Sequence, residues 1–174
     1  MKIQKAILAA ILLTAGVSAT AHANLVTNGD FSAGGVDWTT TNPTHYFGNP
    51  QGYHEGAVNT NGTLSQTFAD VAGDLLTVSF DFKSNDSTSY QYVSFNGITV
   101  PGTLVSGPTS LTSYSFTLGT ATGSDTITFN GRNNPSFNGL FNVDVESTPT
   151  PEPASIALLG VGLLGLVALR RKAS

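Results

Sequence analysis

The side chains best suited to contact a sugar are concentrated in one segment of the sequence, residues 38–54. This segment contains Trp38, Tyr46, Tyr53 and His54 among asparagines, glycines and prolines. Aromatic rings stack on the flat C–H faces of sugars, and amide side chains pair with sugar hydroxyls. Two interpretations remain open. The rings form a carbohydrate-binding site on a loop, where binding residues are common, or they pack into the core of the domain.

Catalytic chemistry has much weaker support in the sequence. Beyond residue 23 the only histidines are His45 and His54, and there is no G-x-S-x-G motif for a serine nucleophile. A glycosidase needs two carboxylates at a cleft, but Glu55 is the only glutamate before Glu146 and the acids show no suggestive spacing. We therefore expect no enzyme activity, with a polysaccharide-active enzyme kept as an alternative.

The distribution of charge along the 174 residues limits the possible partners. All eleven acidic residues lie between Asn24 and Pro153, where Lys83 and Arg132 are the only bases. An anionic domain repels a polyanion, so no nucleic acid partner is expected. The chain has no cysteine, which excludes disulfides and thiolate metal sites.

The first 23 residues have the pattern of a secretory signal peptide. Lys2 and Lys5 precede the apolar residues 6–17, and residues 21–23 supply a small-x-small cleavage site. Signal peptidase is then an expected partner. The mature chain is predicted to begin at Asn24, outside the inner membrane.

The C-terminal segment has three parts. Residues 148–153 are a proline-rich spacer, in which each proline disfavours helix for the residue before it. Residues 154–169 are apolar and predict a transmembrane helix, which ends at the basic pair Arg170 and Arg171. By the positive-inside rule this pair stays cytoplasmic and the preceding domain faces outward.

This order of elements resembles the PEP-CTERM sorting signal of Gram-negative bacteria. The recognition element of that family corresponds here to Pro151, Glu152 and Pro153, and its closing basic cluster to Arg170 and Arg171. The resemblance implies processing by an exosortase, transient anchoring in the inner membrane, and delivery to the cell surface or an exopolysaccharide matrix.

The region between the two ends predicts a single all-β domain over residues 24–147. Leu76, Val78, Phe80 and Phe82 alternate with polar residues, which is the period of a half-buried strand. The dipeptide at residues 96–97, Asn-Gly, is a strong signal for a two-residue hairpin turn. About eight such strands, separated by turn residues, favour an antiparallel jelly-roll β-sandwich.

Two segments of this region resemble carbohydrate-binding modules with a galactose-binding-like jelly roll. They are the opening residues 24–31, followed by Trp38, and the closing residues 141–145. The resemblance implies a carbohydrate ligand. It also implies a possible structural calcium ion held by Asp30 and Asp144, through oxygen ligands of the kind that calcium prefers.

Together these patterns predict an exported, non-catalytic surface or matrix protein that contacts exopolysaccharide. A structural or adhesive coat protein of the biofilm, with no discrete ligand site, is the alternative.

Overall fold

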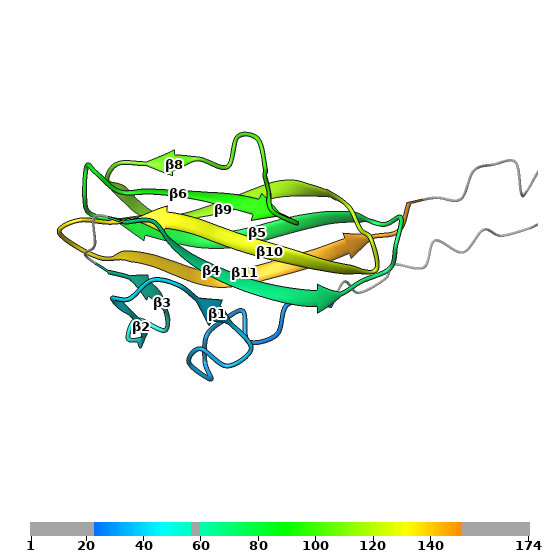
Figure 1. Ribbon diagram of the computed structural model, residues 1–174, viewed down its shortest axis with the longest axis horizontal. Coiled ribbons are helices and arrows are strands. Elements are labelled where there is room, and N and C mark those ends of the chain that lie inside the picture. Colours follow the sequence, from blue (N-terminus) through cyan, green and yellow to red (C-terminus); the bar gives the residue numbers. More distant parts are fainter. Residues whose placement is uncertain (1–22, 57–59, 151–174) are drawn as a thin grey trace, which may run out of the picture.

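The computed structural model describes residues 23–56 and 60–150, and these residues form eleven β-strands and no helix. The strands build two antiparallel sheets that pack face to face (Figure 1). The predicted all-β antiparallel sandwich is therefore confirmed. The predicted signal helix and transmembrane helix lie outside the described residues. Within those residues, no helix has the length and hydrophobicity needed to cross a bilayer.

The first sheet, called sheet A here, has the strand order β1-β4-β10-β6-β7, and β8 also pairs with β6. Its strands are β1 (Thr39–Thr40), β4 (Gly62–Ala69), β6 (Tyr90–Phe95), β7 (Ile98–Thr99), β8 (Val105–Ser106) and β10 (Ser124–Arg132). The second sheet, sheet B, has the order β2-β3-β11-β5-β9. Its strands are β2 (His45–Gly48), β3 (Gly52–Glu55), β5 (Leu75–Ser84), β9 (Thr109–Thr120) and β11 (Asn138–Thr148).

The core lies between the two sheets and is built by alternate residues of the long strands. In β5 the predicted inward face is confirmed, since every second side chain from Leu76 to Phe82 is at most 3% exposed. The facing strands of sheet A contribute Leu64, Ile127 and Phe129. Because a one-residue slip would turn all these side chains to solvent, their burial fixes the register of both sheets.

The turn between β6 and β7 has the predicted conformation. Asn96 and Gly97 have φ values of 49° and 79°, the positive values that a type I′ turn requires at both positions. The described residues form eleven strands rather than about eight. The difference arises because three of them, β1, β7 and β8, are only two residues long.

The segment that contains the candidate sugar-binding side chains is not a loop, which corrects one expectation. Residues 45–55 form the antiparallel hairpin β2–β3, in which His45 pairs with Glu55 and Gly48 with Gly52. β3 also pairs with β11, so this hairpin is an extension of sheet B rather than an independent loop.

Both ends of the sandwich domain meet at one place. The Asn24 side chain donates to the carbonyl of Val143 (2.9 Å) and accepts from the amide of Val145 (2.9 Å). The amide of Leu25 donates to the carbonyl of Val145 (2.8 Å). The start of the domain is therefore fixed against the end of β11, from which the proline-rich spacer leaves.

Candidate functional site

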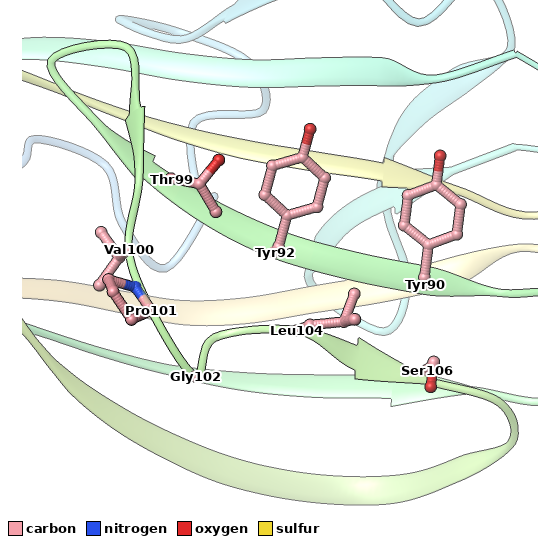
Figure 2. Close-up of a pocket in the computed structure, with 8 residues that line it drawn as sticks. All are labelled: Tyr90, Tyr92, Thr99, Val100, Pro101, Gly102, Leu104 and Ser106. Atoms are coloured by element: carbon pink, nitrogen blue, oxygen red, sulfur yellow. The ribbon is translucent and has the colours of Figure 1, made fainter.

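Two tyrosines form an aromatic strip on the outer face of sheet A. In β6 the side chains of Gln91 and Val93 are buried, so that Tyr90 and Tyr92 point to the other side of the sheet. Their ring centroids are 6.4 Å apart and their planes differ by 16°. Figure 2 shows the two rings side by side, with both hydroxyls pointing the same way. The pair therefore offers a nearly flat aromatic surface along the strand.

The connection between β7 and β8, residues 100–104, borders this aromatic strip and is called the lip here. After β7 the chain leaves the edge of β6 and returns to it at β8, where Ser106 pairs with Tyr90. In between, the amide of Val100 donates to the carbonyl of Val93 (2.9 Å). The Thr103 hydroxyl accepts from the Val93 amide (3.0 Å) and donates to the Val100 carbonyl (2.7 Å). These bonds hold the lip against β6.

The lip and the strip together border an open pocket of about 520 Å³. Its lining is mainly apolar on the lip side, where the side chain of Leu104 is 64% exposed. Gly102 has a φ of 78°, and this left-handed conformation lets the lip turn back without a side chain in the way. The residues that line the pocket (Figure 2) are Tyr90, Tyr92, Thr99, Val100, Pro101, Gly102, Leu104 and Ser106.

Polar groups surround the aromatic strip on the neighbouring strand. Tyr90 pairs with Arg132 of β10, and the Arg132 guanidinium lies 5.3 Å from the centre of the Tyr90 ring. The hydroxyl of Tyr90 donates to the side chain of Asn61. Asn130, which pairs with Tyr92, donates to the Ser94 hydroxyl (3.0 Å). Flat rings beside fixed amide, hydroxyl and guanidinium groups can stack on a sugar and bind its hydroxyls.

The predicted site residues Trp38 and Tyr53 lie in the core. Trp38 is 8% exposed, its ring packs against Phe31 at 5.5 Å, and its indole N–H donates to the carbonyl of Asn28 (3.1 Å). Tyr53 is 4% exposed and its hydroxyl bonds that of Thr40 (3.2 Å). Burial raises the pKa of the Tyr53 hydroxyl above its usual range. Both rings have the position that the packing interpretation expects.

The other two predicted residues, Tyr46 and His54, lie together on the outer face of sheet B. Tyr46 is 43% exposed, and its ring stacks on the imidazole of His54 at 4.4 Å with an angle of 8°. The structure therefore divides the four predicted residues between the core and this surface, and it does not bring them into one site.

Tyr90 and Tyr92 were not among the predicted site residues, although the sequence contains a signal for them. On the predicted strand, Val93 and Phe95 define the core-facing side. Tyr90 and Tyr92 have the opposite parity and must therefore face outward. Two aromatic side chains on the solvent side of one strand are the feature that could have indicated this site.

The predicted calcium ligands have very different surroundings. Asp30 is fully exposed, and its carboxylate accepts from the Ser32 amide (3.0 Å), which lowers the pKa of the Asp30 carboxyl. Asp144 is partly buried and its Oδ1 has no hydrogen-bond partner; desolvation and the nearby Glu146 raise its pKa. Within the described residues no three His, Asp or Glu side chains form a metal-binding group. Calcium at these aspartates stays a prediction, supported by the unpartnered oxygen of Asp144 alone.

One more acidic residue has an unusual environment. Glu55 at the end of β3 is 4% exposed and accepts from the side-chain amide of Asn42 (3.3 Å). Burial raises the pKa of its carboxyl to about 7. A raised carboxyl pKa is typical of a general acid, but this side chain points between the sheets and does not reach either aromatic surface.

The fold of this chain is similar to that of carbohydrate-binding modules. One solved structure with the same fold is TmCBM61 in complex with β-1,4-galactotriose, with 14% identity and a TM-score of 0.59 over 72% of this chain and 99% of that one. Another is a module of family 4, with 14% identity and a TM-score of 0.56 over 71% of this chain and 99% of that one. These likenesses establish the jelly-roll fold.

An enzyme also contains this fold. The enzymatically active domain of tailspike protein 4 from bacteriophage CBA120 matches with 19% identity and a TM-score of 0.55. The match covers 72% of this chain but only 21% of the tailspike domain. No curated protein matches the sequence of this chain.

Residues 149–172 match the PEP-CTERM protein-sorting motif. The chain therefore carries the sorting signal that its proline–glutamate–proline element predicts. This motif indicates export and sorting to the cell surface.

Proposed function

We propose that this chain is an exported, non-catalytic protein of the cell surface or extracellular matrix, and that it contacts exopolysaccharide through the Tyr90–Tyr92 strip. The observation that carries the proposal is the flat aromatic pair in an open pocket of about 520 Å³, on the outer face of a sheet. The sorting motif at residues 149–172 supports a location where polysaccharide is available.

The side chains around the strip make two kinds of contact with the ligand, stacking and hydrogen bonding. The rings of Tyr90 and Tyr92 stack on successive sugar units, while the apolar lip covers the other side of the chain. Arg132 contacts only one face of the Tyr90 ring, and a planar ring has a second face available for stacking. Asn130 and the threonine hydroxyls of β10 supply hydrogen bonds to sugar hydroxyls.

Replacing Tyr92 by alanine is expected to weaken polysaccharide binding several-fold without unfolding the protein. An aromatic contact contributes about 0.5–1.5 kcal/mol beyond the area that it buries, and 1.4 kcal/mol is a factor of ten in affinity. The measurement is a glycan array followed by calorimetric titration, with β-1,4-galactotriose, the ligand of TmCBM61, as the first individual probe.

Two variants control this experiment. Tyr92→Phe keeps the ring and should retain most of the affinity if stacking dominates. Val71→Ala changes a side chain that is 65% exposed on the β4–β5 connection, away from the strip, and should have no effect. Binding that survives Tyr90→Ala and Tyr92→Ala together would contradict the assignment of the strip as the ligand site.

Processing of the tail is the second part of the proposal. An exosortase is expected to cleave near Pro153 after transient membrane anchoring, and signal peptidase to cleave before Asn24. Mass spectrometry of surface-exposed protein should then give a chain that begins at Asn24 and lacks residues 154–174. Recovery of those residues in the mature surface protein would instead indicate a permanent anchor.

A structural or adhesive coat protein is the alternative, and one observation favours it. Strand β9 forms an edge of sheet B and extends over twelve residues without a charged side chain or a proline. Natural proteins usually protect such an edge from pairing with another chain. If no glycan binds, lateral association of copies through β9 would become the better description of the function.

A further inference from the structure

A second pocket lies on the opposite side of the sandwich, on the outer face of sheet B. The sheet register places Tyr46 of β2, His54 of β3, Gly139 of β11 and Lys83 of β5 in one row across four strands. Gly139 has no side chain, and the ring of Phe141 occupies the space beside it, so that this ring lines the row between His54 and Lys83. The cavity over the row has a volume of about 200 Å³, less than half that of the pocket over the Tyr90–Tyr92 strip.

Aromatic rings form one wall of this second pocket in a fixed arrangement. His54 Nε2 lies 2.8 Å from the carbonyl oxygen of Pro50, which holds the imidazole against the ring of Tyr46. Phe137 meets Tyr46 edge to face at 5.2 Å. Tyr46 and Phe137 remain 43% and 41% exposed, so ring surface is available to a ligand without rearrangement of the core.

Lys83 provides a positive charge on the side of this pocket that β5 forms. No described residue forms an ion pair with Lys83, although ten acidic side chains occur among the described residues. Lys83 and Arg132 are the only bases in those residues. Each of the two therefore lies beside one of the two aromatic surfaces, Arg132 on sheet A and Lys83 on sheet B.

We propose that this pocket binds a single acidic sugar unit of a polysaccharide, a uronate, with its ring on Tyr46 and its carboxylate at Lys83. The aromatic wall supplies the stacking surface, the unpaired ammonium recognises the carboxylate, and Asn85 and Ser136 at the rim supply polar groups for hydroxyls. The net negative charge of the domain excludes a general attraction of polyanions. Recognition of the uronate therefore depends on the local geometry of this pocket.

This inference goes beyond the proposed function, because the two surfaces lie on opposite sheets and bind independently. A protein with both sites holds one polysaccharide chain on each face. The Tyr90–Tyr92 strip and the uronate pocket are therefore tested with different variants and different probes.

The test uses the full-length chain and three monosaccharides that differ only at C6: D-galacturonate, its methyl ester and D-galactose. The amide NMR spectrum is expected to show shifts at His54, Lys83 and Gly139 with galacturonate, and weaker binding of the two neutral sugars. Lys83→Gln should weaken galacturonate binding roughly 1.5- to fivefold, the range of an exposed charge pair, and remove the preference over galactose. Lys83→Arg should retain it.

Further outcomes separate this proposal from the proposed function. Tyr46→Ala should weaken all three sugars, whereas Tyr92→Ala should leave galacturonate binding unchanged. Equal affinity for galacturonate and galactose, or an unchanged affinity in Lys83→Gln, would overturn the uronate site. The several-fold weaker binding of galactotriose by Tyr92→Ala would remain valid evidence for the strip in that case, because this variant tests sheet A alone.

Discussion

Replacing Trp38 by alanine is expected to lower the free energy of unfolding by about 3–5 kcal/mol, the usual cost of removing a large buried aromatic side chain. The indole is 8% exposed and packs between Phe31 and Phe129, at 5.5 and 6.4 Å. The variant also leaves the carbonyl of Asn28 without its indole donor. Chemical denaturation followed by circular dichroism measures the loss.

The matched control is Tyr46→Ala in the same segment, which removes a ring that is 43% exposed and should cost far less stability. Emission of the lone tryptophan should be blue-shifted and should not respond to saturating polysaccharide, because its ring is enclosed. A small loss of stability combined with a loss of sugar affinity in Trp38→Ala would contradict the core position and indicate that Trp38 binds sugar.

Replacing Glu55 by glutamine is expected to stabilise the protein above pH 7 and to flatten its pH dependence. Burial raises the pKa of this carboxyl from 4.5 to about 7, so between these values the folded chain binds more protons than the unfolded chain. Stability is therefore fully present below pH 4.5 and falls as pH rises through 7. At 1.36 kcal/mol per pKa unit, the contribution lost by pH 8 is about 3 kcal/mol.

Glutamine keeps the acceptor oxygen for the Asn42 amide but carries no charge, so that the contribution of Glu55 is removed selectively. Asp70 and Asp144 also have raised pKa values because of burial, and only the difference between wild type and variant isolates Glu55. Denaturation midpoints from pH 5 to pH 8 provide the measurement, with Asp37→Asn, a change at an exposed carboxylate, as the control. Parallel curves for wild type and Glu55→Gln would show that Glu55 titrates normally.

The long strands could be predicted from the sequence because their side chains alternate between core and solvent. Leu76 to Phe82 follow this pattern without interruption, and the Asn96–Gly97 turn requires a conformation that few other dipeptides adopt. The same turn predicts β7, whereas the short strand β8 could not be predicted in this way. The chain that leads to β8 is held against β6 by the Thr103 side chain, which bonds the backbone of Val93 ten residues earlier.

The candidate sites were harder to predict because aromatic side chains serve both packing and binding. Tyr53 and His54 are neighbours on one strand and point to opposite faces of sheet B, yet both are buried. Tyr53 is covered by the core, whereas His54 is covered by the ring of Tyr46. The sequence alone does not reveal which strand lies beside β3, and that neighbour decides whether an outward ring is exposed.

The joining of the two domain ends at β11 has a mechanical consequence. A protein that is held through the residues that follow β11 and pulled by a polysaccharide near the β2–β3 hairpin carries the load along β11 (Figure 1). The paired residues of β11 and β5 extend from Gly139 to Thr148, and their hydrogen bonds are perpendicular to the strands. A load along β11 pulls the two strands past each other. Many hydrogen bonds between β11 and β5 then resist together rather than opening one after another. The domain would thus withstand tension best in the direction in which its tail and a bound matrix would pull it.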